Sequence, residues 1–452
     1  MPFIPHTNEE ITQMLSAIGA PSLEALFDEI PEALKVTGAV NQLPAGRSEM
    51  EVMRIMQKRA AQDAGFQCFL GAGAYEHHIP SAVWELVSRG EFLTSYTPYQ
   101  AEASQGTLQT IYEYQTMIAH LTSMEVSNAS LYDGASALAE AILMAVRATH
   151  KKNTKKVLLL GGIHPHYVQT CENIVKYQNI ELECVAFDKN SGKIEETLHK
   201  IQATDLVAVV IQQPNFFGIL ENADEVTRWA HQHNCLVIAS INPIAAALIT
   251  PPGEWGDKGA DIVVGEGQSL GIPLSSGGPY FGFMATKKSL IRHMPGRIVG
   301  RTTDMNGKIG FTLTLQAREQ HIRRSKATSN ICTNQGLAVT AATIYMSIMG
   351  HEGLKRSAIQ SHIQCSILMD TLTKLGIKKR FSGEFFHEVV IELPFSAEKI
   401  AARMLSEFNI IAGLPLGFID TAFENCLLVC VTETKNEDDI KTYVESLKQI
   451  LQ

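Results

Sequence analysis

The chain has 452 residues, of which 45% are hydrophobic and 19% are charged, and its formal net charge is −9. These proportions are typical of a globular protein, and the length allows two or three domains, or one large domain with a smaller one. The acidic balance excludes a basic surface for nucleic acid, and no apolar run reaches the roughly 18 residues that span a bilayer. We therefore expect no nucleic-acid partner and no membrane association.

The N-terminus and the cysteines indicate a reducing compartment. Residues 1–10 lack a basic stretch followed by an apolar core, so they predict neither a signal peptide nor a transit peptide. The eight cysteines form no CxxC pair and are expected to be small buried side chains. We therefore expect a cytoplasmic protein.

The first 65 residues predict an N-terminal helical arm. Thr7 and Glu10 have the spacing of a capped helix start, and apolar residues then recur at helical spacing as far as Gly19. A short helix is expected at 22–27 and a longer one at 46–66. Such an arm usually packs against a neighbouring domain or subunit.

A glycine-rich loop with two adjacent histidines occupies residues 69–80. A dinucleotide-binding fingerprint would need a glycine at the position of Glu76 and a strand and helix around the loop, so an NAD-dependent oxidoreductase is disfavoured. His77 and His78 are candidate metal ligands. Adjacent loop histidines point in different directions, however, and no third ligand is evident, so we expect no metal site.

The segment 92–106 predicts an extended polar and aromatic loop that leads into a helix at 107–122. It carries hydroxyl and amide side chains and few aliphatic ones. Such a loop stays ordered when its polar groups find partners, often a ligand or another subunit. A solvated crossover is the alternative that the sequence leaves open.

The middle of the chain alternates between helices and strands. An alanine-rich helix begins near Asp133 or Gly134, and its free N–H groups could bind an anion, although the carboxylate of Asp133 would repel one placed beside it. Short apolar runs beyond it are separated by amphipathic helices, which predicts a parallel sheet covered on both faces. The expected strands are 157–161, 184–187, 206–211 and 235–240, and the expected helices are 165–177, 194–201 and 221–233.

A glycine-rich segment from Asp261 to Gly282 connects an expected strand at 262–264 to another at 280–285. Enzymes of the aminotransferase type hold pyridoxal phosphate (PLP) on such a strand–loop–strand unit, where a lysine just after the first strand forms a Schiff base. Gln268 stands at that position here, and an amide nitrogen is not nucleophilic. An ordinary α/β domain with a glycine loop is the alternative.

A second position that handles the cofactor follows the strand at 235–240. Enzymes of this fold place an aspartate there to keep the pyridine nitrogen protonated, whereas this chain has the neutral Asn242. Both residues that would handle the cofactor, a lysine at position 268 and an aspartate near position 242, are thus replaced, which favours a degenerate cofactor domain. The fold class that we predict is α/β, with an aminotransferase-like (PLP-dependent transferase fold type I) large domain over residues 66–334.

The last part of the chain predicts a small C-terminal α+β domain over residues 335–452. A helix at 335–349 leads into it, and the remaining expected elements are helices at 353–375, 397–408 and 437–451 and strands at 388–393, 410–412 and 426–432.

Several arginines are clustered between residues 292 and 324 of the sequence. Arginine is a natural partner for carboxylate or phosphate, but a solvated or subunit-facing surface explains such a cluster equally well.

Six motifs together resemble one family, the glycine cleavage system P-protein. The motifs are Phe3-Ile-Pro-His-Thr, Phe69-Leu-Gly-Ala-Gly-Ala-Tyr, Tyr96-Thr-Pro-Tyr-Gln, Ser104-Gln-Gly, Met294-Pro-Gly-Arg-Ile-Val-Gly and Arg318-Glu-Gln-His-Ile-Arg-Arg. The resemblance covers essentially the whole chain. Within the family, the chain resembles the subunit of the two-chain form that lacks the cofactor-binding lysine.

The resemblance implies a division of labour between subunits. The lysine that binds PLP belongs to the other chain, subunit 2, which agrees with Gln268 here, and this chain alone is expected to be inactive. The implied assembly is an α2β2 heterotetramer that decarboxylates glycine and passes the aminomethyl group to the lipoyl arm of the H-protein. A non-enzymatic binding or regulatory protein on a degenerate PLP-enzyme fold is the alternative.

Candidate site residues follow from this resemblance. We expect the polar loop to complete the partner's site, and we expect three arginines to hold the substrate carboxylate or the acidic H-protein. The loop residues are Tyr96, Thr97, Tyr99, Gln100 and Gln105, and the arginines are Arg297, Arg301 and Arg323.

Overall fold

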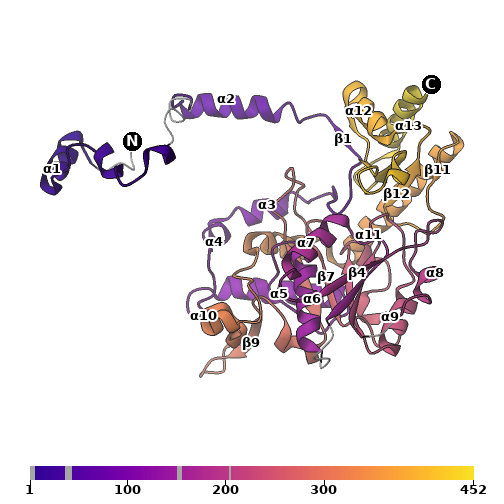
Figure 1. Ribbon diagram of the computed structural model, residues 1–452, viewed down its shortest axis with the longest axis horizontal. Coiled ribbons are helices and arrows are strands. Elements are labelled where there is room, and N and C mark those ends of the chain that lie inside the picture. The colour runs from indigo at the N-terminus through magenta and orange to yellow at the C-terminus, as the bar shows by residue number, and fades with distance from the viewer. Residues whose placement is uncertain (1–5, 36–42, 150–154, 203–204) are drawn as a thin grey trace. The chain divides into compact units, whose positions relative to one another are not determined.

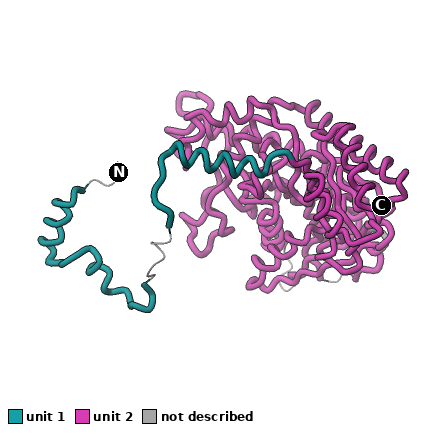
Figure 2. Tube along the Cα trace, turned by 90° about the horizontal axis from the view of Figure 1, so that it is seen from above, with its two compact units in different colours: residues 1–65 teal, residues 66–452 magenta. Residues whose placement is uncertain are grey.

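The computed structural model describes residues 6–35, 43–149, 155–202 and 205–452 (Figure 1). The chain divides into two compact units, residues 1–65 and 66–452, which Figure 2 colours teal and magenta. The first family motif lies partly outside the described residues, from Phe3 to Pro5. The expected boundary between residues 334 and 335 stays a prediction.

The first unit is helical where it is described. Its elements are α1 (Asn8–Ile18), η1 (Glu24–Phe27), η2 (Glu32–Leu34) and α2 (Glu49–Ala60), where η marks a 3-10 helix. Both α-helices begin with a capping box, formed by Thr7 with Glu10 and by Ser48 with Glu51. None of the described residues of this unit is buried, so its apolar side chains find no core within it.

A seven-stranded sheet organises the second unit, with the strand order β2-β8-β7-β6-β5-β3-β4. Strands β7, β6, β5, β3 and β4 are parallel, whereas β8 is antiparallel to both of its neighbours. The predicted parallel sheet is confirmed, with strand ends shifted by up to three residues. The bounds are β2 (Val126–Ser127), β3 (Lys156–Leu160), β4 (Glu181–Val185), β5 (Leu206–Gln213), β6 (Leu236–Ile241), β7 (Ile262–Glu266) and β8 (Gly282–Thr286).

Helices cover both faces of this sheet (Figure 1). Successive residues of a strand face opposite sides, so Val157 and Leu159 enter one core while Leu158 and Leu160 enter the other. The first core contains residues of α6 (Gly134–Ala148) and α7 (Pro165–Val175), and the second contains residues of α5 (Gln105–Leu121), α9 (Ala223–Gln232) and α11 (Gly336–Lys374). Each fully buried aliphatic side chain stabilises the fold by roughly 1.5–3 kcal/mol.

A smaller antiparallel sheet follows, with the order β11-β12-β15-β14. The second half of α11 packs on it with α12 (Ala397–Phe408) and α13 (Glu437–Leu451). Helix α11 bends at Gly350, whose φ is 59°, and this bend separates the two helices that the sequence predicts. The strands are β11 (Lys378–Lys379), β12 (Glu388–Glu392), β14 (Leu414–Pro415) and β15 (Cys426–Cys430).

Two short strand pairs lie outside these sheets. β1 (Gln67–Cys68) pairs in parallel with β13 (Ile410–Ile411), so the predicted strand near 410–412 does not join the antiparallel sheet. A hairpin of β9 (Val299–Thr303) and β10 (Ile309–Leu313) follows β8. The remaining elements are α3 (Ala82–Val87), α4 (Gly90–Leu93), α8 (Glu195–Leu198), η4 (Ala245–Ala247), η5 (Pro252–Glu254), η6 (Lys288–His293), η7 (Gln316–Arg318), α10 (Gln320–Arg323), η8 (Arg324–Lys326) and η9 (Thr421–Phe423).

Two sequence expectations need correction. The helix expected at 194–201 is a single turn, α8, because one turn already buries Ile194 and Leu198. The strand expected from Tyr280 begins at Gly282. Among the described residues, no helix is both long and apolar enough to cross a membrane.

Candidate functional site

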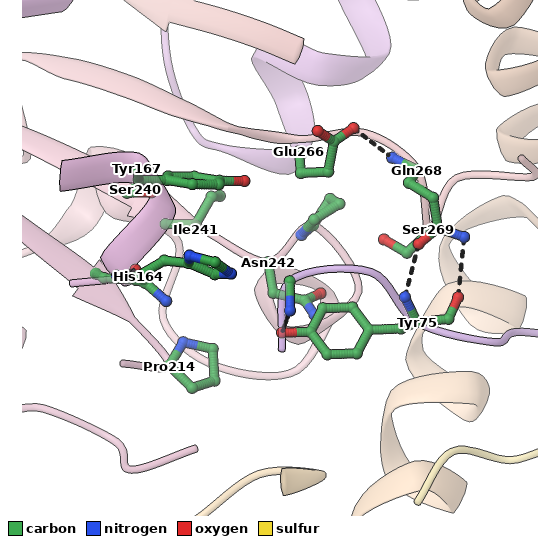
Figure 3. Close-up of a pocket in the computed structure, with 13 residues that line it drawn as sticks. Tyr75, His164, Tyr167, Pro214, Ser240, Ile241, Asn242, Glu266, Gln268 and Ser269 are labelled. Carbon is green, nitrogen blue, oxygen red and sulfur yellow. Dashed lines mark hydrogen bonds between the residues drawn. The ribbon is translucent and has the colours of Figure 1, made fainter. Parts of the chain in front are cut away.

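The carboxyl ends of the parallel strands surround a small cavity of about 40 Å³. Figure 3 shows the side chains that line it, which come from the ends of β5, β6 and β7, from the start of α7 and from the loop before α3. Open α/β sheets bind their ligands at this edge, so it is the expected place for a cofactor. The lining residues are Gly73, Tyr75, His164, Tyr167, Gln212, Pro214, Ser240, Ile241, Asn242, Pro243, Glu266, Gln268 and Ser269.

Gln268 is buried at this cavity, and its carboxamide is fully engaged. Its Oε1 accepts a hydrogen bond from the backbone N–H of Tyr75 over 2.8 Å. Its Nε2 donates to the backbone oxygens of Tyr75, over 2.9 Å, and of Ile272, over 2.7 Å. The side chain thus fixes the loop before α3 against the loop after β7 (Figure 3). None of the described residues that line the cavity is a lysine, and this amide cannot replace one as a nucleophile.

Glu266, the last residue of β7, occupies the N-terminus of α6. Its Oε2 accepts from the backbone N–H of Gly134 over 2.9 Å, and its Oε1 accepts from that of Gln268 over 3.2 Å. Burial raises the pKa of this carboxyl to about 8, and the nearby charge of Asp133 adds to the increase. The carboxylate of Asp133 in turn accepts from the backbone N–H of Ser136. These two first-turn donors of α6 therefore already have partners within the chain.

Asn242 follows β6, and its side-chain amide also makes hydrogen bonds within the chain. Its Oδ1 accepts from the backbone N–H groups of Ile244, over 2.8 Å, and Ala245, over 3.1 Å, and its Nδ2 lies 3.2 Å from Nε2 of His387. Burial lowers the pKa of His387 well below its ordinary value, so the ring faces Asn242 as a neutral group. That Asn242 stands at the position of the carboxylate for a pyridine nitrogen stays a prediction.

PLP does not fit this site. The cavity of about 40 Å³ is far below the roughly 300 Å³ at which pockets begin to hold small molecules. Among its described lining residues there is no lysine, Asn242 brings no negative charge, and the carboxyl group of Glu266 stands where a phosphate would meet α6. The site of this chain is filled by its own side chains.

Four residues of this site did not emerge from the sequence as site candidates. They are Tyr75, His164, Tyr167 and Glu266. The ring of His164 stacks on that of Tyr167 with 4.9 Å between centroids, and its Nε2 lies 2.8 Å from the backbone oxygen of Ala72. A signal was present for two of them: Glu266 ends a buried apolar strand between two glycines, and His164 lies between a strand and the proline that starts α7.

The expected partner-site loop forms a second cluster with other segments. The hydroxyl of Tyr99 lies 2.7 Å from Oγ1 of Thr333 and donates to Oδ1 of Asn334 over 2.9 Å. The guanidinium of Arg297 stacks over the Tyr99 ring, 4.0 Å from its centroid, and donates to the backbone oxygen of Cys332. We name Tyr99, Arg297, Thr333 and Asn334 the Tyr99 cluster. None of its members lines the cavity at Gln268.

The other loop candidates differ in their surroundings. Tyr96, with 92% of its surface exposed, Thr97 and Gln100 are open to solvent. The carboxamide of Gln105 pairs with the backbone of Phe311 in β10, accepting from its N–H and donating to its oxygen, both over 2.8 Å. Gln105 therefore supports the β9–β10 hairpin, and a role in the partner's site stays a prediction.

The three candidate arginines are not brought together by any contact between the described residues. Arg297 is held in the Tyr99 cluster, and its Nε lies 3.8 Å from the carboxylate of Glu319. Arg301 is exposed on β9, and Arg323 is exposed with its Nε bonded to the backbone oxygen of Ala317. A contact of these arginines with the substrate or the H-protein stays a prediction.

Among the described residues, no three or more His, Cys, Asp or Glu side chains are grouped so that they could hold a metal ion, and His77 and His78 therefore belong to no such group. His77 is buried, and its Nδ1 lies 2.7 Å from Oε2 of Glu433. Burial tends to raise the pKa of Glu433, but the hydrogen bond and charge of His77, together with backbone hydrogen bonds that include the one from His78, lower it. This contact joins the loop before α3 to the segment after β15.

Comparisons with known proteins agree with this architecture. The family model of the glycine cleavage system P-protein matches residues 1–447. A relative from Nitrosospira multiformis named "Probable glycine dehydrogenase (decarboxylating) subunit 1" is 57% identical over 453 residues, covering 100% of this chain and 99% of the relative. A relative of the same name from Alcanivorax borkumensis is 56% identical over 453 residues, covering 100% of both chains.

One solved structure shares the family and another shares only the fold. A crystal structure of a glycine decarboxylase (P-protein) of the glycine cleavage system, in an inhibitor-bound form, covers 100% of both chains with 40% identity and a TM-score of 0.87. A sphingosine-1-phosphate lyase from Burkholderia pseudomallei shares the fold alone, with 11% identity, a TM-score of 0.65, and coverage of 92% of this chain and 93% of that chain.

The seven-stranded sheet, the position of the cavity and the likeness to solved structures define a protein of PLP-dependent fold type I. Within this class, the chain belongs to the glycine cleavage system P-protein family.

Proposed function

We propose that this chain is the subunit of a two-chain glycine dehydrogenase (decarboxylating) that does not carry the cofactor. The names of its curated relatives support its place in that enzyme, because each is named as a probable subunit 1 of glycine dehydrogenase (decarboxylating). Together with a lysine-bearing subunit 2 it decarboxylates glycine. The carboxylate leaves as CO2, the aminomethyl group joins one sulfur of the lipoyl disulfide on the H-protein, and the other sulfur is reduced to a thiol.

The observation that carries the proposal is that the side-chain amide of Gln268 is fully hydrogen-bonded within this chain. All of its hydrogen-bonding atoms hold backbone groups of this chain, at the position where a PLP enzyme needs its lysine. PLP, when bound, supplies an electron sink, and that chemistry belongs to the partner subunit. On its own, this chain is inactive in glycine decarboxylation.

The contribution of this chain to the reaction is a surface that completes the partner's site. The Tyr99 cluster orders a polar loop whose neighbours Tyr96, Thr97 and Gln100 are exposed. An ordered loop with exposed polar groups is pre-organised to contact a neighbouring subunit. Arg301 and Arg323, which are exposed, provide positive charge for the substrate carboxylate or the acidic H-protein.

The proposal includes the assembly and its surroundings. The enzyme is an α2β2 heterotetramer that works with the lipoylated H-protein in the cytoplasm. Residues 66–334 act as the large domain and residues 335–452 as the small one. The first 65 residues, whose described part has no core of its own, pack on a neighbouring surface.

The test is the visible absorption spectrum of the chain with added PLP, alone and then co-expressed with its partner subunit. We expect a protein-bound cofactor band only in the complex, and after hydride reduction we expect the cofactor mass on a lysine of the partner. A cofactor mapped to a lysine of this chain would overturn the proposal. Failure to copurify with a lysine-bearing subunit of similar fold would favour the alternative, a regulatory protein.

A further inference from the structure

A second, larger cavity of about 710 Å³ lies between α6, α7 and the segment 325–331. It shares no lining residue with the filled site at Gln268, and its volume is within the range of roughly 300–1,000 Å³ that small-molecule sites occupy. The lining residues are Tyr132, Ser136, Glu140, Leu143, Val146, Arg147, Lys155, Ile174, Gln178, Ile180, Ser325, Ala327, Thr328, Ser329, Asn330 and Ile331.

Two charged side chains of α6 are left incompletely bonded at this cavity. Glu140 is only 6% exposed, and its buried Oε2 has no hydrogen-bond partner within the described structure. Arg147 donates from one Nη to the backbone oxygen of His293, while its buried Nε has no partner there. The two residues are seven positions apart on α6, about two helical turns, and both line the cavity. No ion pair within 4.0 Å joins these two described side chains.

Such atoms need an explanation, because a buried donor or acceptor without a partner costs roughly 1–3 kcal/mol, and more when it is charged. Burial raises the pKa of Glu140, although the hydroxyl of Ser329 and the charge of Arg147 oppose the increase. Burial likewise lowers the pKa of Arg147, against the attraction of Glu140. A ligand with one strong donor and one strong acceptor would satisfy both atoms.

The rest of the lining restricts the chemistry of that ligand. A simple anion would leave Oε2 of Glu140 without a donor, and a simple cation would leave Nε of Arg147 without an acceptor. Lys155 adds a second positive charge to the lining, which favours a carboxylate on the ligand. The other side chains include five aliphatic ones that suit an apolar body: Leu143, Val146, Ile174, Ile180 and Ile331.

We propose that this cavity binds a free α-amino acid with an apolar side chain. Its ammonium group donates to Oε2 of Glu140, its carboxylate accepts from Nε of Arg147, and its side chain contacts the aliphatic residues. The site is separate from the chemistry of glycine. Its wall, segment 325–331, leads directly into Cys332, Thr333 and Asn334, whose groups bind Arg297 and Tyr99.

The experiment is isothermal titration calorimetry of the full chain, without a partner, with L-leucine. Two matched compounds each lack one charge: 3-methylbutylamine has no carboxylate, and 4-methylpentanoate has no ammonium group. We expect saturable binding of L-leucine and at least about tenfold weaker binding of either analogue, since a lost charged contact is worth about 1.4 kcal/mol or more. Binding should also slow amide hydrogen exchange in residues 325–331.

Variants separate this site from nonspecific binding. Glu140→Gln and Arg147→Gln should each weaken L-leucine binding at least about tenfold, whereas Glu172→Gln, an exposed change of the same kind on α7, should leave it unchanged. Glu140→Gln keeps the shape of the side chain, so it should fold even if the arginine variant does not. The proposal is overturned if L-leucine shows no saturable binding, or binds both variants as well as the native chain. Because no partner or cofactor is present, neither outcome bears on the spectroscopic test of the proposed function.

Discussion

The Oε2 atom of Glu266 accepts a hydrogen bond from the backbone N–H of Gly134 over 2.9 Å. The acceptor ends β7 and the donor begins α6, so a side chain of the chain itself occupies the helix terminus at which an anion would bind. A Cβ on Gly134 would meet the Tyr167 hydroxyl and the backbone of Glu266, so the approach requires glycine. The carboxyl group of Glu266 thus occupies the position at the start of α6 where a phosphate could otherwise bind.

This contact predicts a pH dependence of stability. The pKa of Glu266 is raised to about 8 from an ordinary value of 4.5, so the folded chain binds more protons than the unfolded chain between those pH values. The contribution of this group to the free energy of unfolding therefore falls as the pH rises from about 4.5 to about 8, and levels off above that. Glu266→Gln should lack this contribution.

The measurement is urea unfolding of the native chain and of Glu266→Gln from about pH 5 to about pH 9. The free energy of unfolding of the native chain minus that of the variant should fall with rising pH, by on the order of a few kcal/mol. Glu113→Gln, an exposed change on α5, should give a difference that does not vary with pH. A difference that rises with pH would show that the carboxyl is ionised in the folded chain.

Removal of the Gln268 side chain should destabilise the fold, and we expect it to remove no reactive group, because the amide is not a nucleophile. Gln268→Ala leaves the N–H and oxygen of Tyr75 and the oxygen of Ile272 without their partner. We expect a loss of roughly 2–4 kcal/mol in the free energy of unfolding, because buried polar groups that lose a partner are costly. Gln232→Ala, at an exposed position on α9, should change it by less than about 0.5 kcal/mol. Equal effects of the two variants would contradict the structural role given to Gln268.

The hydroxyl of Tyr99 predicts an effect on turnover. Tyr99→Phe keeps the ring under Arg297 but removes the contacts with Thr333 and Asn334, so the loop loses its fixed position. We expect kcat of the assembled complex to fall about tenfold, which corresponds to about 1.4 kcal/mol, while subunit association by size-exclusion chromatography is unchanged. Tyr177→Phe, at a side chain that is 84% exposed, serves as the matched control. Native turnover in Tyr99→Phe would remove this loop from the proposed site.

Local sequence patterns predict the framework of this site well. Continuous apolar runs identify β5, β6 and β7, and the positions just after β6 and β7 then place Asn242 and Gln268 at one edge of the sheet. Hydrophobic period and the succession of strands and helices along the chain are properties of neighbouring residues, so a single sequence carries them. The family motifs add the loop before α3 and the Tyr99 loop.

Contacts between distant segments account for what the sequence does not predict. Glu266 meets a donor 132 residues away, and the amide of Gln105 meets a strand 206 residues away. The two glycines beside Glu266 mark the end of a buried strand, but nothing near it in the sequence shows that its carboxyl group binds the start of a helix 132 residues away. The pairing of β1 with β13 is hidden for the same reason, because two-residue strands have no period of their own.

Arg301 offers a test of the proposed encounter with the H-protein. Its side chain is exposed on β9, in a hairpin whose backbone is held by hydrogen bonds with the side-chain amides of Gln105 and Gln115. Arg301→Gln should raise the KM for the H-protein several-fold at low salt and have little effect at high salt, because exposed charges are screened within about 10 Å at 0.1 M ionic strength. Arg356→Gln removes an equal charge from the exposed face of α11 and should leave the KM unchanged at every salt concentration. If the two variants behave alike, the H-protein is attracted by net charge alone and Arg301 has no specific part in its docking.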